Sequence, residues 1–348
     1  MNLQIQKRIN KFLTLLKVIR FNPVIFAPYF GLSNSVRVHL RFINLDLYAD
    51  KLLLENLIKF SKLLDSGVKV YHLHKRYLRL EIPWINVLSP PLLVEDAIKL
   101  SNFLLYLKEL LKLGAVLDVE KSIISLNFYP KSPKFKIDLW SDVYEALYIY
   151  YAERLFGKLF VRNNIILKDA IVIDIGGYIG DTAIFFALEG ARNVFSFEPH
   201  PMLFDLLQTN ISLNSLEKTV IPYRLAVGDN SKVIPLRVPP GKYRTYKTLG
   251  ITTSGSGPII CYAQQVAFEE ILSKFNEVDI VKFNCEGCEY SSILSSSVES
   301  LRKIKYFIIH MHECDVSLRL ALLTQLKKAG FKLLEHYERE YYLFGLYR

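Results

Sequence analysis

The sequence predicts an α/β protein in which a doubly wound, mainly parallel sheet follows a smaller, basic α+β domain. Three observations predict this fold class. From about residue 170 onward, short apolar strand patterns alternate with helical patterns, as they do when helices cover both faces of a parallel sheet. Glycine and acidic residues follow the first two of these strands. Residues 1–150 carry +8 of the net charge of +10, which sets the first half apart from the second.

Composition predicts a folded protein of two domains. Of 348 residues, 51% are hydrophobic and 22% are charged, which supplies a large core and excludes general disorder. We place the domains at residues 1–135 and 136–348, because Pro130, Ser132 and Pro133 interrupt the pattern between them. No apolar run reaches the ~20 residues of a membrane span. Four cysteines are too few for a disulfide scaffold, which predicts a cytoplasmic protein.

Residues 3–20 have the pattern of an amphipathic basic helix. Apolar residues recur at helical spacing and basic residues lie mostly opposite them: Ile5, Ile9, Phe12, Leu13 and Leu16 against Lys7, Arg8, Lys11 and Lys17. We expect this helix to pack on its own domain. The alternative is a peripheral contact with a membrane surface, which would place the protein at the inner face of the membrane.

The remainder of the first domain has the order strand, helix, strand, strand, helix, strand, which is typical of a split βαβ, or ferredoxin-like, sheet. The predicted segments are strands at 36–42, 68–73, 77–82, 115–118 and 122–128 and helices at 50–65 and 95–113. In the first strand, Arg37, His39 and Arg41 share one face. This face and the basic charge favour an anionic partner, which could be a nucleic acid, a lipid surface or an acidic glycan.

The second domain begins with a long aromatic-rich helix at about 143–160, and strands and helices then alternate. Strands are predicted at 171–174, 193–197, 220–227, 279–283, 306–310, 333–337 and 342–347, and helices at 182–189, 201–213, 267–275, 290–301 and 317–329. The last two strands indicate a closing hairpin with one reversed strand. Ligands of such sheets lie outside the carboxyl ends of the strands, so we expect the chemistry there.

A glycine-rich turn follows the first strand of this domain, with the sequence Asp174-Ile175-Gly176-Gly177-Tyr178-Ile179-Gly180-Asp181-Thr182. It is not the dinucleotide fingerprint, because Tyr178 and Asp181 stand where that motif needs glycine. The second strand ends at Glu198, where an acid can accept hydrogen bonds from both hydroxyls of a ribose. The turn and the acid together predict a nucleoside site, although Glu198 could instead cap the following helix.

Polar residues also crowd the ends of the fourth and fifth strands. The fourth ends in Lys282-Phe283-Asn284-Cys285-Glu286-Gly287-Cys288-Glu289, and the fifth ends in His310-Met311-His312-Glu313-Cys314. Such clusters are unfavourable at buried strand ends unless they are paired or functional. The spacing of Cys285 and Cys288 invites a zinc interpretation, but no second spaced pair accompanies it, so we predict no metal. A disulfide between them is equally disfavoured in a reducing cytosol.

These motifs, together with Phe197-Glu198-Pro199 and Asn210-Ile211-Ser212-Leu213-Asn214, resemble the FkbM family of S-adenosylmethionine-dependent methyltransferases over residues 168–345. The resemblance implies the Rossmann-like class I methyltransferase fold with a seven-stranded sheet, S-adenosyl-L-methionine as cofactor, and O-methylation of sugars or other hydroxyls. It also implies three sets of cofactor contacts: the methionine part at Asp174, Gly176, Gly177 and Gly180, the ribose at Glu198, and the adenine near Ala226 and Val227.

Two departures from the family pattern affect the catalytic interpretation. Gly177 and Tyr178 replace the usual residues of the turn, and Asn284 replaces the aspartate of the family's Lys-x-Asp-x-Glu-Gly-x-Glu motif. An asparagine can orient a hydroxyl but cannot act as a base. The remaining candidates for the base are Glu286, His310 and His312, and we favour Glu286 or His312. Alternatively, the two histidines are hydrogen-bonded residues of the core that take no part in catalysis.

The acceptor is expected to be a hydroxyl on a glycan, a glycolipid or another small molecule, and an anionic acceptor would suit the basic charge. The alternative is an RNA methyltransferase whose basic first domain binds RNA, with Tyr71 and Arg79 joining the basic strand face. A third hypothesis is a scaffold that keeps the fold without turnover. Residues 242–257 form a basic, flexible insertion that could close over an acidic substrate or could be a plain surface loop.

Overall fold

The computed structural model describes residues 36–40, 45–49, 51–74, 76–127, 131–137, 147, 155–237, 259–312, 314–337 and 341–347. The predicted helix at 3–20, most of the helix predicted at 143–160, and the insertion at 242–257 therefore lie outside the described residues. The chain divides into two compact units. One comprises Met1–Leu113 and Asp138–Tyr148, and the other comprises Gly114–Ile137 and Ile149–Arg348. The boundary at residue 135 stays a prediction.

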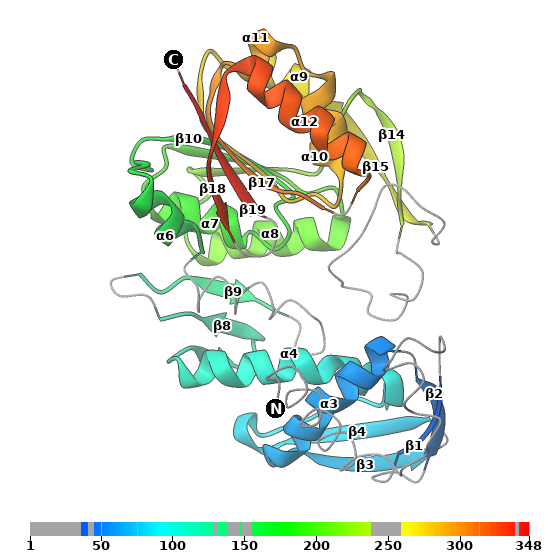
Figure 1. Ribbon diagram of the computed structural model, residues 1–348. Coiled ribbons are helices and arrows are strands. Elements are labelled where there is room, and N and C mark those ends of the chain that lie inside the picture. Colours follow the sequence, from blue (N-terminus) through cyan, green and yellow to red (C-terminus); the bar gives the residue numbers. More distant parts are fainter. Residues whose placement is uncertain are drawn as a thin grey trace, which may run out of the picture. The chain divides into compact units, whose positions relative to one another are not determined.

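The first unit contains two long helices and short antiparallel strands (Figure 1). Its elements are β1 (Val36–Leu40), β2 (Leu45–Ala49), α3 (Lys51–Asp65), β3 (Lys69–His74), β4 (Tyr77–Ile82), β5 (Val87–Leu88), β6 (Leu92–Leu93) and α4 (Val94–Lys112). Alternate residues of β4 are buried (Leu78, Leu80 and Ile82), and they share one core cluster with α3 and α4. The half-buried strand pattern predicted for residues 77–82 is therefore confirmed.

The ferredoxin-like arrangement predicted for this half is wrong for the described strands. β1 pairs with β2 alone, and β4 pairs with β3, β5 and β6 in a separate sheet. The final predicted strands are β7 (Val116–Asp118) and β8 (Ile123–Ser125), which pair with each other and belong to the second unit. β8 also pairs with β9 (Lys134–Lys136). Each pairing joins strands close in sequence, so local hairpins replace the long-range pairing that a split βαβ sheet requires.

The second unit is built on a seven-stranded sheet with the order β12-β11-β10-β16-β17-β19-β18 (Figure 1). Five strands run parallel, and β19 pairs antiparallel with both β17 and β18, so the closing hairpin with one reversed strand is confirmed. The strands are β10 (Ile171–Ile175), β11 (Asn193–Phe197), β12 (Val220–Tyr223), β16 (Val278–Phe283), β17 (Ile304–His310), β18 (Phe331–Tyr337) and β19 (Tyr341–Leu346). This is the Rossmann-like class I methyltransferase fold that the sequence implied.

Helices cover both faces of this sheet, as predicted (Figure 1). On one face lie α6 (Leu155–Arg162), α7 (Asp181–Leu188) and α8 (Pro201–Leu213), and on the other lie α9 (Phe268–Ser273), α10 (Cys288–Ser295), α11 (Val298–Leu301) and α12 (Val316–Ala329). Successive side chains of β10 point to opposite faces of the sheet. Val172 belongs to the core cluster of the first face, and Ile173 and Ile175 belong to that of the second.

Two further features of this unit differ from the sequence prediction. The strand predicted at 220–227 is two strands, because the chain leaves the sheet after β12. It then forms β13 (Ala226–Gly228), which pairs with β15 (Ile259–Ala267) and, through it, with β14 (Lys232–Arg237). The helix predicted at 290–301 is split into α10 and α11, where Ser297 accepts a hydrogen bond from the backbone N–H of Ser300 and begins a new helix. No described helix is long and apolar enough to cross a membrane.

Candidate functional site

The glycine turn after β10 brings three strand ends into contact. Gly176 has a φ of +82°, and a Cβ atom there would lie 1.8 Å from the carbonyl oxygen of Asn284 after β16. The backbone N–H groups of Gly176 and Gly177 both donate to the carbonyl oxygen of Phe197 in β11, at 3.0 and 2.9 Å. Only glycine fits this close approach, so the turn fixes the carboxyl edge of the sheet.

Glu198 lies directly beside this turn. Its carboxylate accepts hydrogen bonds from the backbone N–H groups of Tyr178, at 2.9 Å, and His200, at 2.9 Å. The residue is 6% exposed. Burial raises the pKa of Glu198 to about 7, although these two N–H groups and nearby Lys282 act in the opposite direction. The turn and the acid, which the sequence predicts as one nucleoside site, are therefore in contact.

Asp174 is anchored inside the protein. It is fully buried and forms an ion pair with Lys282, whose Nζ lies 2.8 Å from Oδ1. The hydroxyls of Thr182 and Ser196 also donate to its carboxylate, at 3.1 Å. Lys282 donates a second hydrogen bond to the carbonyl oxygen of Gly176 at 2.8 Å. Asp174 thus holds the turn through neighbouring side chains, and its predicted contact with a cofactor stays a prediction.

Asp181 is a candidate that the sequence interpretation missed. It begins α7 immediately after Gly180, which has a φ of +89° and lies so close to Leu207 that a Cβ would meet that side chain at 2.8 Å. Burial raises the pKa of Asp181 to about 6, against the lowering effect of Lys282. The signal in the sequence is an acid directly after the glycine turn, which we used only to exclude the dinucleotide fingerprint. Perturbed carboxyl groups cluster at functional sites.

Ala226 and Val227 both lie buried in β13. Val227 packs in the same core cluster as Ile175 and Phe197, the last residues of β10 and β11. This packing brings β13 to the carboxyl ends of those strands. The predicted place beside an adenine ring stays a prediction.

Asn284 directly follows β16, and its side chain forms a hydrogen bond with a residue of β19. Its backbone N–H donates to the carbonyl oxygen of Ile175 at 2.9 Å. Its side-chain amide donates to the hydroxyl of Tyr341 at 3.0 Å. Tyr341 is the first residue of β19, and no sequence pattern connects it to Asn284, which lies 57 residues away. The reversed direction of β19 brings it to this edge.

His312 and Glu289 form the second polar cluster of this edge. Glu289 is fully buried at the start of α10, and its Oε1 lies 3.0 Å from Nδ1 of His312 and 3.0 Å from the backbone nitrogen of His312. Nε2 of His312 lies 3.0 Å from Nδ1 of His310 and 3.5 Å from Oε1 of Glu286. The structure therefore brings together all three candidate bases and adds Glu289, which the sequence supplied only as part of a motif.

The charges around His312 decide its protonation. Burial lowers its pKa, but the carboxylates of Glu286 and Glu289 outweigh burial and raise the pKa to about 9. His312 is therefore mainly protonated at neutral pH, which weakens its predicted role as an independent base. Glu286 has a φ of +57°, and its side chain is 39% exposed.

Cys285 and Cys288 form a disulfide, which corrects the expectation that they stay reduced. Their Cα atoms lie 5.5 Å apart across the turn that begins α10. Among the described residues, no group of three or more His, Cys, Asp or Glu side chains is arranged to hold a metal ion.

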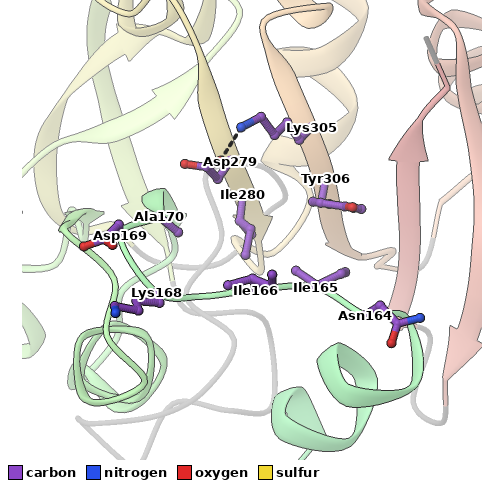
Figure 2. A pocket seen from close by; sticks show the side chains of 10 residues that line it. All are labelled: Asn164, Ile165, Ile166, Lys168, Asp169, Ala170, Asp279, Ile280, Lys305 and Tyr306. Carbon is purple, nitrogen blue, oxygen red and sulfur yellow. Dashed lines mark hydrogen bonds and ion pairs between the residues drawn. The ribbon is translucent and has the colours of Figure 1, made fainter.

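A cavity of about 300 Å³ lies at the opposite, amino end of the sheet (Figure 2). It is lined by Asn164, Ile165, Ile166, Lys168, Asp169, Ala170, Asp279, Ile280, Lys305 and Tyr306. Lys305 points toward Asp279 on the neighbouring strand, with Nζ 2.7 Å from Oδ1 of Asp279. None of the predicted site residues borders this cavity, and parallel sheets bind their ligands at the carboxyl end, so we do not assign the site here.

Comparison with known proteins finds a family similarity in the second unit. Residues 174–333, a little under half of the chain, match the family model of the methyltransferase FkbM domain. The hexuronic acid methyltransferase AglP of Haloferax volcanii is 27% identical over 147 residues, which are 42% of this chain. The matched region spans only 57% of the length of that relative.

Solved structures show similarity at low identity. The methyltransferase FkbM of Methylobacillus flagellatus is 14% identical, with a TM-score of 0.38 over 71% of this chain and 60% of that one. TrmK of M. capricolum, in complex with S-adenosyl-homocysteine, is 14% identical, with a TM-score of 0.29 over 53% of this chain and 66% of that one.

Proposed function

We propose that the protein, whose residues 174–333 match the family model of the methyltransferase FkbM domain, transfers the methyl group of S-adenosylmethionine to an oxygen of a glycan acceptor. The observation that carries this proposal is the contact between Glu198 and the glycine turn at the carboxyl edge of β10 and β11. A buried acid in this position accepts hydrogen bonds from two neighbouring hydroxyls, and a ribose presents such a pair.

The residues present fit the cofactor. The two backbone N–H groups orient the carboxylate of Glu198 at the carboxyl edge of β11, beside the glycine turn. Asp181, at the end of the turn, supplies a second carboxylate for the positively charged methionine part. Bound S-adenosylmethionine supplies an electrophilic methyl group. The protein must then hold the acceptor oxygen ~3–3.5 Å from that carbon and exclude water.

Two observations support an oxygen acceptor on an acidic glycan. Asn284 places an amide at the strand end beside the glycine turn, where it can orient a hydroxyl. The chain carries a net charge of +10, which attracts an anionic acceptor. The named acceptor of the curated relative is a hexuronic acid, so we propose a uronate-containing glycan as the acceptor class.

The RNA alternative rests on the basic first half of the sequence. The structure does not describe the side chains of Arg37, His39 and Arg41, so it adds no support for RNA binding. Tyr71, one of the proposed contacts, has its hydroxyl engaged by Glu81. We keep RNA as an outcome of the experiment and do not argue for it further.

Calorimetry with S-adenosylmethionine tests the cofactor, and transfer of a labelled methyl group tests the acceptor. We expect wild-type protein to bind the cofactor and Glu198→Gln to bind it at least tenfold more weakly. Asp205→Asn, on the exposed surface of α8, is the matched control and should bind normally. Label should appear in uronate-containing oligosaccharide and not in RNA. Failure of the wild type to bind the cofactor would refute the proposal and favour a scaffold.

A further inference from the structure

We propose that the disulfide between Cys285 and Cys288 is a redox site, which a dithiol reduces reversibly and which controls the acceptor side of methyl transfer. For its effect on turnover, this inference rests on the proposed function. The disulfide lies in the turn between β16 and α10, at the carboxyl edge of the sheet. The proposed methyl transfer uses neither sulfur, so this pair of cysteines has no role in the reaction itself.

The disulfide lies where a thiol can reach it. Both cysteines are partly exposed, and Glu286 between them has a side chain that is 39% exposed. The other two of the four cysteines, Cys261 and Cys314, are free thiols. Since the structure describes all four cysteines, a reductant changes this molecule at one defined place.

The disulfide closes a turn whose backbone few residues favour. Glu286 has a φ of +57° and Gly287 a φ of +109°, so both lie in the left-handed region. Residues with a side chain rarely adopt this conformation. The disulfide holds the Cα atoms at the two ends of the turn 5.5 Å apart. Reduction removes this constraint, and the turn can then relax to a more favourable backbone.

Both ends of this turn belong to the candidate site. Asn284, directly before Cys285, carries the amide that we propose orients the acceptor hydroxyl. Glu289, directly after Cys288, is fully buried, and its Oε1 lies 3.0 Å from Nδ1 of His312. A movement of the turn therefore reaches the acceptor side of the site through the two adjoining residues.

The sulfur of Cys285 also lies beside the buried carboxylate. Its Sγ is 3.5 Å from Oε2 of Glu289, and the same oxygen accepts a hydrogen bond from the backbone N–H of Gly287 at 3.1 Å. A disulfide sulfur carries no proton, whereas a thiol in this place can donate its S–H to the carboxylate. Reduction thus changes the hydrogen bonds of Glu289, and with them the surroundings of His312.

The exchange balances in atoms and electrons. A thiolate of the dithiol attacks Sγ of Cys285, the S–S bond breaks, and its electron pair stays on Sγ of Cys288, where the N-terminus of α10 stabilises a thiolate. The second thiol of the reductant then attacks the mixed disulfide and releases Cys285. The dithiol is oxidised by two electrons to a disulfide, and its two protons end on the two cysteine thiols.

The oxidised form is expected to be the more active one. While the disulfide is closed, it restricts the backbone that carries Asn284 and Glu289. Without this restriction, the amide of Asn284 should hold the acceptor less precisely. Cofactor binding should change little, because Glu198 is oriented by the backbone N–H groups of Tyr178 and His200, which lie outside this turn.

The experiment uses native full-length protein with dithiothreitol as the dithiol, followed by iodoacetamide and mass spectrometry. We expect alkylation of Cys285 and Cys288 after reduction, none there without it, and return of the disulfide with oxidised glutathione. The reduced protein should methylate a glucuronic-acid-terminated oligosaccharide with a kcat/KM about tenfold lower, because small displacements of positioning groups have effects of this size. The nuclear magnetic resonance signals of the His312 ring should also shift on reduction.

Two variants separate the disulfide from the free thiols. The double variant Cys285→Ser/Cys288→Ser should have the kcat/KM of the reduced wild type, with and without dithiothreitol. Cys261→Ser is the matched control, because it removes a free thiol and keeps the disulfide, and it should respond to dithiothreitol as the wild type does. Circular dichroism checks that each form is folded, and the wild-type measurements need no variant.

Two results would overturn this proposal. Alkylation of Cys285 and Cys288 only after denaturation would refute the redox site, and equal kcat/KM in the two forms of the wild type would refute its control of methyl transfer. Wild-type protein that methylated no oligosaccharide would instead refute the proposed function. Alkylation would then still decide whether the redox site exists, and the His312 signals would decide whether the site responds to it.

Discussion

A lysine–aspartate pair lies at each end of the seven-stranded sheet, and the two pairs differ mainly in burial. At the carboxyl end, Lys282 and Asp174 face each other across β16 and β10, with side chains 2% and 0% exposed. At the amino end, Lys305 and Asp279 belong to β17 and β16, with side chains 40% and 27% exposed. The contact distances are almost equal, at 2.8 and 2.7 Å.

The comparison shows that distance alone does not determine how much an ion pair contributes to stability. The partners of the exposed pair remain solvated when it is broken, whereas breaking the buried pair leaves one charge without water. The buried pair also contacts the glycine turn through Lys282, and Lys282 moderates the pKa of Glu198. Burial thus couples stability to the proposed cofactor site at one end of the sheet, and the other end has no such coupling.

The largest expected effect is that of Lys282→Met. Removing the lysine leaves the buried carboxylate of Asp174 with hydroxyl donors only, so the free energy of unfolding should fall by about 3–5 kcal/mol. Urea denaturation measures this change. A loss below about 1 kcal/mol would show that burial does not distinguish the two pairs.

A second effect at the carboxyl end concerns His312. Its pKa is raised from 6.5 to about 9 in the folded state. Its ion pairs therefore stabilise the folded state fully below pH 6.5, and this stabilisation is lost as pH rises through 9. This contribution to the free energy of unfolding should be about 3 kcal/mol. Denaturation of wild type and His312→Gln between pH 6 and 10 measures it. The pH dependence should be smaller in the variant, and equal curves would contradict the assignment.

Glu198 should change cofactor affinity and stability in opposite directions. Burial raises its pKa to about 7, above its usual value of 4.5. Relative to the ionised acid, the protonated acid increases the free energy of unfolding, and this increase is lost as pH rises through 7. Glu198→Gln should therefore unfold at a higher temperature than wild type at pH 8, while its cofactor affinity falls about tenfold, or ~1.4 kcal/mol. Wild-type affinity should also decline below pH 7, because the protonated acid accepts fewer hydrogen bonds. Equal affinities at pH 6 and 8 would contradict the role of the ionised acid.

The smallest expected effect is that of Lys305→Met at the amino end. This pair is partly exposed, so the free energy of unfolding should change by less than about 1 kcal/mol, and cofactor affinity should not change. The same urea and calorimetric measurements apply. A large loss of affinity would connect the amino-end cavity to the site and contradict the comparison.

Much of the second unit could be predicted from the sequence, because its strands and helices differ in period and glycines or acids mark their ends. The turn from Asp174 to Gly180 and the strand end at Glu198 are the strongest cases, since local sequence determines both. The closing hairpin could also be predicted. The pairing partners of the small strands could not, because β13 and β15 are separated by about thirty residues.

The contacts within the site were the least predictable part. Periodicity gave no reason to pair Lys282 with Asp174, because a lysine in an apolar strand usually faces solvent. Tyr341 entered only through the reversed final strand, and the disulfide was disfavoured by an argument about compartment, not geometry. In the first unit, the ferredoxin-like prediction failed because the structure adds the short strands β2, β5 and β6 and pairs strands that are close in sequence.

The direction of β19 has a practical consequence for handling the protein. The strand starts at the carboxyl edge with Tyr341, opposite His310, and finishes at the amino edge, where Gly345 lies opposite Tyr306. A tether attached beyond Leu346 therefore leaves the second unit at the edge remote from the glycine turn. Immobilising the protein on a sensor chip through such a tether would present the edge with the proposed cofactor site of this unit to the flowing sample.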